Sequence, residues 1–206
     1  MQSTWVVGSL DALRTLLASS DDLNISSATT VVLLPTAAAF TGITQAALEL
    51  AAPFETHEAR VEALMLSDRA SNDEASFAQR VADADVVVLA DGSALHARSV
   101  WLDTAVGEAI RNAQTLIAVG SAASVLGETM IDPRGGAPTL GLGYRVGVAT
   151  TASKSDEQLA RTRALLGERE VLAVLGPSGI LHHDGATWRV VSGDVVTTRG
   201  EVRVEL

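Results

Sequence analysis

LIAVGSAASVLGETMIDPRGGAPTLGLG, residues 116–143, is the segment around which we interpret the rest of the chain. It continues an apolar run, Thr115–Val119, that predicts a short buried strand. Gly120-Ser121 then predicts a sharp turn, and the small residues Ala122–Leu126 suit the first turns of a helix. A strand, a Gly-Ser turn and a helix form the frame of a nucleophile elbow. In that frame a serine hydroxyl stands above the sheet, and the next backbone N–H faces a developing oxyanion.

The spacing around the serine supports this elbow only in part. The pattern G-x-S-x-G requires glycine two places before and two places after the serine, where this chain has Val119 and Ala123. The segment therefore predicts either an elbow with Ser121 as its nucleophile or an ordinary strand-to-helix turn.

Strand and helix patterns alternate through most of the chain. Continuous apolar runs such as Thr30–Leu34 and Ala84–Leu89 are typical of strands buried on both faces, and helical spacing separates them. The pattern predicts an α/β fold in three layers, a doubly wound and mostly parallel sheet covered by helices on both faces. We expect Val86–Leu89 and Leu116–Val119 to be adjacent central parallel strands. A site is then expected in the crevice beyond the carboxyl ends of the strands.

The last part of the sequence changes character. A helix is predicted over Ser155–Leu166 and a strand over Val171–Leu175. Short β-prone runs separated by turns such as Asp184-Gly185 follow, which is the pattern of an antiparallel meander. We predict a single domain, residues 1–206, with a core at 1–176 and a C-terminal β meander at 177–206.

Composition excludes several classes of function. Fifteen basic and 25 acidic residues give a net charge of −10, which repels nucleic acid and anionic membrane surfaces. The absence of cysteine excludes disulfides and a thiolate nucleophile, and the histidines lack metal-ligand spacing. We therefore expect no metal and no cofactor. No apolar run is long enough to span a bilayer, and the first residues lack a signal-peptide pattern, which predicts a cytoplasmic location.

Three segments carry a resemblance to a known family: LPTAAAF (34–40), DGSALHARSV (91–100) and ASVLGETMIDPRGGAPTLGLG (123–143). They resemble the dipeptidase E and cyanophycinase family of serine peptidases, and in particular its bacterial, glutamine-amidotransferase-like branch. The resemblance implies a flavodoxin-like α/β fold of the class I glutamine amidotransferase type. It also implies a serine nucleophile at a G-x-S-A-G elbow, a histidine base later in the chain, and a Gly-Gly loop that supplies an oxyanion donor.

The chain departs from this family pattern at each catalytic element. Asp91-Gly92 stands in place of the Gly-Gly pair. The nucleophile position falls on Ser121 if one residue is missing before Met130, and on Gly120 if none is. Thr150 or Thr151 stands where the base is expected, and a threonine cannot take a proton at neutral pH.

The resemblance and the residues together give a set of candidate site residues. Ser121 is the candidate nucleophile, Gly92 and Ala122 are candidate oxyanion donors, and His96 is the candidate relocated base. The candidate substrate-binding residues are Asp91, Arg98 and Arg134, the arginines because a guanidinium can hold a carboxylate through two hydrogen bonds. Alternatively, Arg98 caps a helix and Arg134 ties down its own loop. His182 and His183 are expected to be a surface pair beside a turn.

Two hypotheses follow. In the first, the protein keeps the peptidase fold and crevice without the chemistry, and binds a small peptide, an amino-acid-like ligand or a protein partner. In the second, it is an active serine hydrolase that uses Ser121 and His96. We favour the first because acyl transfer needs nucleophile, base and oxyanion donors together, and each is altered here. A homodimer is a further expectation.

Overall fold

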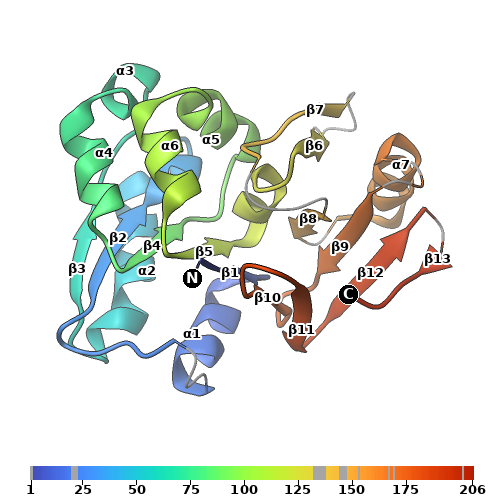
Figure 1. Cartoon of the computed structure of the whole chain (residues 1–206), viewed down its shortest axis with the longest axis horizontal. Helices are drawn as coiled ribbons and strands as arrows, with labels where there is room; N and C mark the ends of the chain where they lie inside the picture. Colours follow the sequence, from blue (N-terminus) through green and yellow to red (C-terminus); the bar gives the residue numbers. More distant parts are fainter. Residues whose placement is uncertain are drawn as a thin grey trace.

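A computed structural model of the protein describes residues 2–19, 23–131, 138–143, 148–152, 154–166, 168, 170–200 and 202–206. It contains a large sheet covered by helices and a smaller sheet beside it (Figure 1). The strands are β1 (Ser3–Val7), β2 (Thr30–Leu34), β3 (Arg60–Ala63), β4 (Val86–Leu89), β5 (Thr115–Val119), β6 (Thr129–Ile131), β7 (Pro138–Leu140), β8 (Val148–Ala152), β9 (Val171–Leu175), β10 (Ile180–His183), β11 (Trp188–Ser192), β12 (Val195–Arg199) and β13 (Val202–Arg203).

Helices occupy the connections between the strands of the large sheet. The α-helices are α1 (Leu10–Ser19), α2 (Ile43–Glu55), α3 (Arg69–Asn72), α4 (Ala75–Ala82), α5 (Ala94–Trp101), α6 (Ala105–Asn112) and α7 (Asp156–Leu166). Two 3₁₀ helices, η1 (Pro35–Ala38) and η2 (Gly120–Val125), follow β2 and β5. None of the helices in the described ranges is long and apolar enough to cross a membrane.

The large sheet has the strand order β11-β10-β1-β5-β4-β2-β3. Five neighbouring strands run parallel to one another: β1, β5, β4, β2 and β3. β4 pairs with β5 in parallel at the centre of the sheet, with Val86 opposite Thr115 and Leu89 opposite Ala118. This confirms the predicted adjacency of the two central strands, and with it the doubly wound, mostly parallel sheet.

Each face of the sheet has its own apolar cluster, because successive strand residues point to opposite sides. In β4, Val86 and Val88 pack in the cluster that includes α1 and α2. Val87 and Leu89 pack in the other cluster, with α4, α5 and α6. All four β4 residues are buried, which is why the strand reads as an unbroken apolar run. Three layers are therefore present, as predicted.

The C-terminal strands pair antiparallel, as predicted, but they divide between two sheets. β10 extends the large sheet beside β1, and β11 pairs with β10. β12 instead pairs with β9 in the smaller sheet, whose order is β13-β12-β9-β8. β10 belongs to the core because all four of its residues are buried. The turn between β9 and β10 contacts the turn between β11 and β12, because the Gly176 N–H donates to the Asp194 carbonyl at 2.7 Å.

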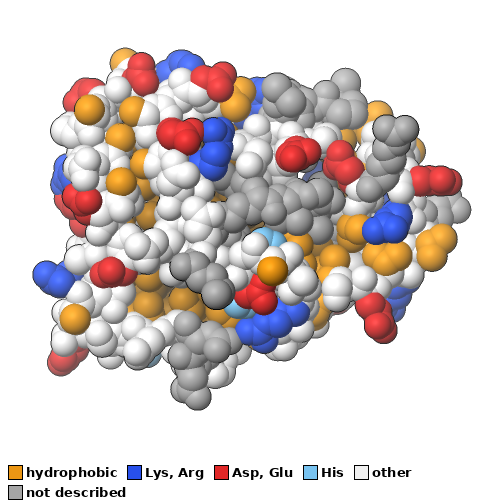
Figure 2. Space-filling view, viewed as in Figure 1, with side chains coloured by type: hydrophobic (Ala, Val, Ile, Leu, Met, Phe, Trp, Pro, Cys, Tyr) orange, Lys and Arg blue, Asp and Glu red, His pale blue; other side chains and the backbone are white. Residues whose placement is uncertain are grey.

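Close backbone contact ties this C-terminal region to the end of β1. The Gly8 N–H donates to the Gly179 carbonyl at 2.9 Å, and a Cβ on Gly8 would lie 1.8 Å from the Gly176 oxygen. Only glycine fits at position 8. The adjacent Ser9 hydroxyl donates to the Pro177 carbonyl at 2.6 Å. Acidic side chains are spread over the surface of the molecule rather than gathered in one patch on the face in Figure 2.

Candidate functional site

Two turns meet where the central strands β4 and β5 end. Ala90-Asp91-Gly92 follows β4, and Gly120-Ser121 begins η2 directly after β5. α5 begins after Ser93, whose side chain accepts the N–H of His96 at 3.3 Å, and it packs against both η1 and η2. Because β4 and β5 are parallel neighbours, their carboxyl-end turns lie side by side.

Asp91, Gly92 and Ser121 form a compact hydrogen-bonded group, which we call the Asp91 clasp. The Ser121 N–H donates to Asp91 Oδ1 at 2.8 Å, and the Gly92 N–H donates to the same oxygen at 2.7 Å. The Ser121 hydroxyl lies 2.7 Å from Asp91 Oδ1 and 2.5 Å from the Gly92 carbonyl oxygen, two acceptors for its one proton. The Gly92 N–H also lies 3.0 Å from Ser121 Oγ. The serine hydroxyl is thus engaged within the clasp.

The sharpest point of the turn after β5 is Gly120, whose φ is +57°. In a nucleophile elbow the serine itself occupies the strained position of the strand-to-helix turn. Ser121 lies one residue later, in a 3₁₀ helix rather than the expected α-helix. A Cβ on Gly120 would lie 2.4 Å from the Asp91 carboxyl carbon and 2.6 Å from both of its oxygens. The Asp91 carboxylate therefore fills the space in which a side chain at position 120 would start.

Gly92 is also required by its surroundings. Its φ is +145°, and a Cβ would lie 2.3 Å from the Ala37 carbonyl oxygen in η1. The same oxygen accepts the Ser93 N–H at 2.7 Å, so the loop lies directly on η1. The surviving glycine of the predicted Gly-Gly pair thus has a packing role here.

The remaining candidate site residues lie around the clasp. Ala122 follows Ser121 in η2 and is fully buried. His96 lies on α5 with its ring edge-on to Phe40 at 4.6 Å; its buried Nε2 has no hydrogen-bond partner within the described part of the chain. His96 Nε2 therefore makes no hydrogen bond with Ser121. Arg98 is half-buried on α5, and Arg134 lies outside the described residues.

Two further pairs of residues, one of threonines and one of histidines, were discussed in the sequence analysis and can now be placed in the fold. Thr150 and Thr151 lie on β8, which packs against η2, so the segment where the resemblance expects a base runs beside the serine turn. The expectation that His182 and His183 are at the surface is wrong, because both are buried on β10. His182 stacks on Trp5 at 3.8 Å, and its Nε2 lies 2.9 Å from Ser3 Oγ. Both histidines thus belong to the folded core rather than to a surface turn.

A pocket of about 430 Å³ opens beside the Asp91 clasp. It is lined by Ser9, Leu10, Ala38, Thr41, Gly42, Gln45, Ala46, Glu49, Leu50, Ala90, Asp91, Gly92 and Val119. These residues include two carboxylates, Glu49 and Asp91, and no Lys or Arg. The Gln45 amide donates to Glu49 Oε1 at 2.8 Å across one turn of α2. Sequence reasoning missed Gln45 and Glu49; their i, i+4 spacing shortly after the segment 34–40 was the available signal.

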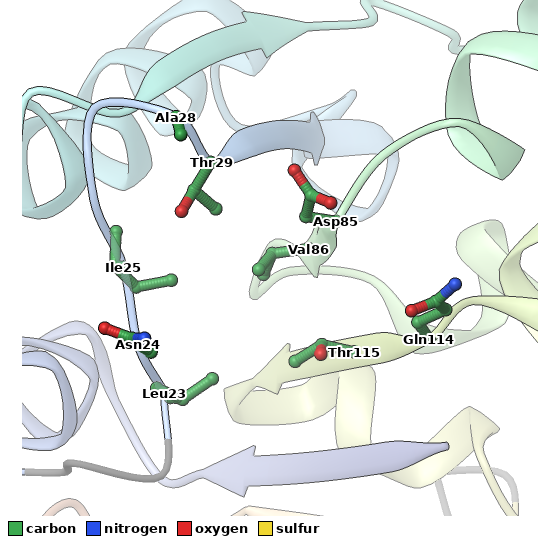
Figure 3. A pocket seen from close by; sticks show the side chains of 9 residues that line it. All are labelled: Leu23, Asn24, Ile25, Ala28, Thr29, Asp85, Val86, Gln114 and Thr115. Carbon is green, nitrogen blue, oxygen red and sulfur yellow. The ribbon is translucent and has the colours of Figure 1, made fainter. Parts of the chain in front are cut away.

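A second pocket, of about 370 Å³, lies at the opposite ends of the strands (Figure 3). Asp85 and Thr29 face into it from the starts of β4 and β2. Asp85 Oδ2 accepts the Thr30 N–H at 2.8 Å and the Thr30 hydroxyl at 2.7 Å. These hydrogen bonds, the backbone one first, hold the pKa of the Asp85 carboxyl below its ordinary value of 3.8. Within the described residues, no group of three or more His, Asp or Glu could hold a metal ion.

Comparison with known proteins identifies structural neighbours. No protein-family model and no curated protein matches the chain. A peptidase from an acI-B1 Actinobacterium has a similar structure with a TM-score of 0.79 and 17% sequence identity, over 100% of this chain and 94% of that one. A putative Peptidase E protein from Listeria monocytogenes EGD-e has a TM-score of 0.66 and 13% identity, over 97% and 98%. The chain therefore has the fold of these peptidases along its whole length.

Proposed function

We propose that the protein is a dipeptidase E-type family member that binds a small peptide or amino-acid-like ligand without cleaving it. The proposal rests on the peptidase fold and on the altered chemistry at the ends of β4 and β5. The pocket beside the Asp91 clasp is the ligand site in this proposal.

One observation carries the non-catalytic assignment. The Asp91 carboxylate lies over Gly120, 2.4 Å from the place of a Cβ at that position, so a side chain at the sharpest point of the turn would have to displace the carboxylate. The nearest hydroxyl, on Ser121, is directed to Asp91 Oδ1 and the Gly92 carbonyl instead. A nucleophile that is not aimed at the substrate gains nothing from the elbow geometry.

The oxyanion donor is altered as well. The Gly92 N–H, which the resemblance assigns to the oxyanion, points to Asp91 Oδ1 at 2.7 Å and to Ser121 Oγ at 3.0 Å. A carboxylate at this position also opposes the negative charge that develops in acyl transfer. Both effects disfavour hydrolysis.

The pocket lining indicates which group of a ligand it would hold. Glu49 and Asp91 are its charged groups, with Ser9, Thr41 and Gln45 as neutral polar neighbours. An α-amino group carries the complementary charge and can donate to a carboxylate and to neutral oxygens at once. We therefore assign the amino end of the ligand to this pocket.

A catalytic alternative is favoured by a single distance. Asp91 Oδ1 lies 2.7 Å from Ser121 Oγ, within the range that a general base needs. In this alternative Asp91, rather than the predicted His96, takes the serine proton.

Labelling with a fluorophosphonate separates the two functions. The probe forms a bond between a nucleophilic serine Oγ and phosphorus and releases fluoride. We expect no labelling of the wild-type protein under conditions that label an active serine hydrolase in a parallel reaction. Labelling that disappears in Ser121→Ala would instead establish the catalytic alternative, and Asp91→Asn would then test the base.

Binding is tested by calorimetric titration with dipeptides and free amino acids. We expect saturable binding that Glu49→Gln weakens about tenfold, because a charge-assisted hydrogen bond is lost. Glu55→Gln is the matched control, since Glu55 is an exposed residue on the same helix that does not line the pocket. Equal weakening by both variants, or tighter binding of N-acetylated dipeptides, would contradict the assignment.

A further inference from the structure

A groove of about 1120 Å³ lies between α7 and the β12–β13 edge of the smaller sheet. It is lined by Ala160, Arg163, Ala164, Glu168, Thr198, Arg199, Gly200, Val202 and Val204. None of these residues belongs to the pocket beside the Asp91 clasp. We propose that this groove is a second binding site, for a ligand that carries a carboxylate on an apolar body.

The first support is a buried hydroxyl with no partner. Thr198 is 6% exposed, and its Oγ1 has no hydrogen-bond partner in the described part of the chain. Its neighbour Thr197, by contrast, uses its hydroxyl to bind the Val204 carbonyl. An unpaired buried hydroxyl is costly, and native proteins seldom leave one unsatisfied. A ligand oxygen in the groove would supply the missing partner.

The second support is an arginine with the same deficit. Arg163 Nε is buried and makes no hydrogen bond within the described residues. Glu168 lines the same groove, and the ion pairs found among the described residues do not include one between Glu168 and Arg163. Arg161, two residues earlier on α7, is paired with Glu157 at 3.1 Å. A guanidinium N–H that is shielded from water and lacks an acceptor favours a ligand that supplies an acceptor oxygen, and an anionic oxygen most strongly.

The shape of the groove follows from the loose cover that α7 gives the sheet. Thr162 is the one buried residue of this helix. Leu172 and Thr198, which are paired on β9 and β12, are nevertheless buried. Thr198 lines the groove while little of its surface reaches solvent, so its side chain lies deep in the groove.

The lining favours a carboxylate with an apolar body over a free inorganic anion. Ala160, Ala164, Val202 and Val204 provide apolar surface next to the Arg163 and Thr198 polar atoms. Apolar side chains gather over β12 and β13 beside a basic one in Figure 2. Arg199 lines the mouth and adds positive charge, in a chain whose net charge is −10. A carboxylate accepts from a guanidinium and a hydroxyl together, and its hydrocarbon part fits the remaining surface.

Two sources share this chemistry, namely a free fatty acid and the C-terminus of an apolar peptide. The 206-residue chain is titrated calorimetrically with decanoate below its micelle concentration, and separately with N-acetyl-Ala-Val-Leu as the free acid. Decanol and the amide of the same peptide are the uncharged controls. We expect saturable binding of at least one acid, and binding of its uncharged control that is about tenfold weaker. The acid that binds identifies the source.

Variants test the residues. We expect Arg163→Met to weaken acid binding about tenfold and Thr198→Val about threefold, with no effect from Arg161→Met on the exposed side of the same helix. If Arg163→Met lowers the melting temperature, Thr198→Val carries the test, because its volume is conserved. No saturable binding of either acid, equal binding of the uncharged controls, or equal loss with Arg161→Met overturns the proposal.

Discussion

An aspartate lies beyond each end of β4, and each aspartate accepts hydrogen bonds from a hydroxyl residue of a neighbouring element, Thr30 in β2 and Ser121 in η2. Before β4, Asp85 Oδ2 accepts the N–H and the hydroxyl of Thr30 at 2.8 and 2.7 Å. After β4, Asp91 Oδ1 accepts the N–H and the hydroxyl of Ser121 at 2.8 and 2.7 Å. The two contacts have the same donor types and the same distances. The same arrangement thus occurs at both ends of the strands. At the amino ends it joins β4 to β2, and at the carboxyl ends it lies where an active serine is expected.

The difference between the two ends lies in the backbone around the aspartate. The Asp91 end has a third donor, the N–H of Gly92, and two glycines with positive φ, Gly92 and Gly120. Thr30 begins a regular strand and has no such turn beside it. The carboxyl end of β4 therefore keeps the backbone of a catalytic turn, although its polar groups bond to one another as a structural clasp does.

The largest effect is expected for Gly120→Ala. The new Cβ would displace the Asp91 carboxylate from three hydrogen bonds and occupy a positive φ, for a loss of about 2–4 kcal/mol in unfolding free energy. Gly143→Ala is the matched control, because Gly143 has a φ of +67° and open space around it; we expect about 1–2 kcal/mol there. Guanidinium denaturation measures both. Equal losses would mean that the carboxylate does not fill the space above Gly120.

A smaller effect is expected when each aspartate is made neutral. Asp91→Asn should lower the unfolding free energy by about 1–2 kcal/mol, since three donors lose a charged acceptor. Asp85→Asn should cost about 0.5–1 kcal/mol, since two donors are affected at an exposed site. Urea denaturation of the two variants compares the ends directly. A larger cost at Asp85 would show that the third bond and the glycine turns add nothing.

The smallest effect is the pH dependence of the Asp85 contact. Its folded pKa is lowered below 3.8 by the Thr30 hydrogen bonds, so the unfolded chain binds a proton first as the pH falls. The stabilisation is complete above the unfolded value and is lost as the pH falls through the folded one. The stability difference between wild type and Asp85→Asn should therefore shrink below about pH 4. Denaturation midpoints from pH 7 to about pH 3 test this. A difference that stays constant over that range would contradict it.

Much of the fold could be predicted from the sequence because its strands are unbroken apolar runs. Val86–Leu89 and Thr115–Val119 are buried on both faces, and parallel pairing follows from the helices between them. The separation of β10 from β12 could not be predicted in this way. Short strands separated by turns look alike in sequence, and the close approach of Gly8 to Gly176, two residues far apart in the chain, has no local sequence signal.

The candidate site was predictable in its location and less so in its bonding. Parallel neighbours end at the same edge, so Asp91 and Ser121 were expected near each other. Which hydrogen bonds Asp91 Oδ1 and the Gly92 carbonyl accept depends on the backbone at Gly92 and Gly120. A sequence pattern does not specify the φ angles of these two glycines. The unpaired Thr198 hydroxyl likewise follows from how closely α7 packs on the smaller sheet.

The overlap between Asp91 and any side chain at position 120 couples these two positions. With Asp91 in this conformation, a Cβ at 120 would lie 2.4 Å from the carboxyl carbon, so a serine at 120 requires the Asp91 side chain to turn away or to be shortened. Turning away breaks the hydrogen bonds from Ser121 and Gly92. An exchange of both residues is therefore expected to cost less stability than the sum of the two single exchanges.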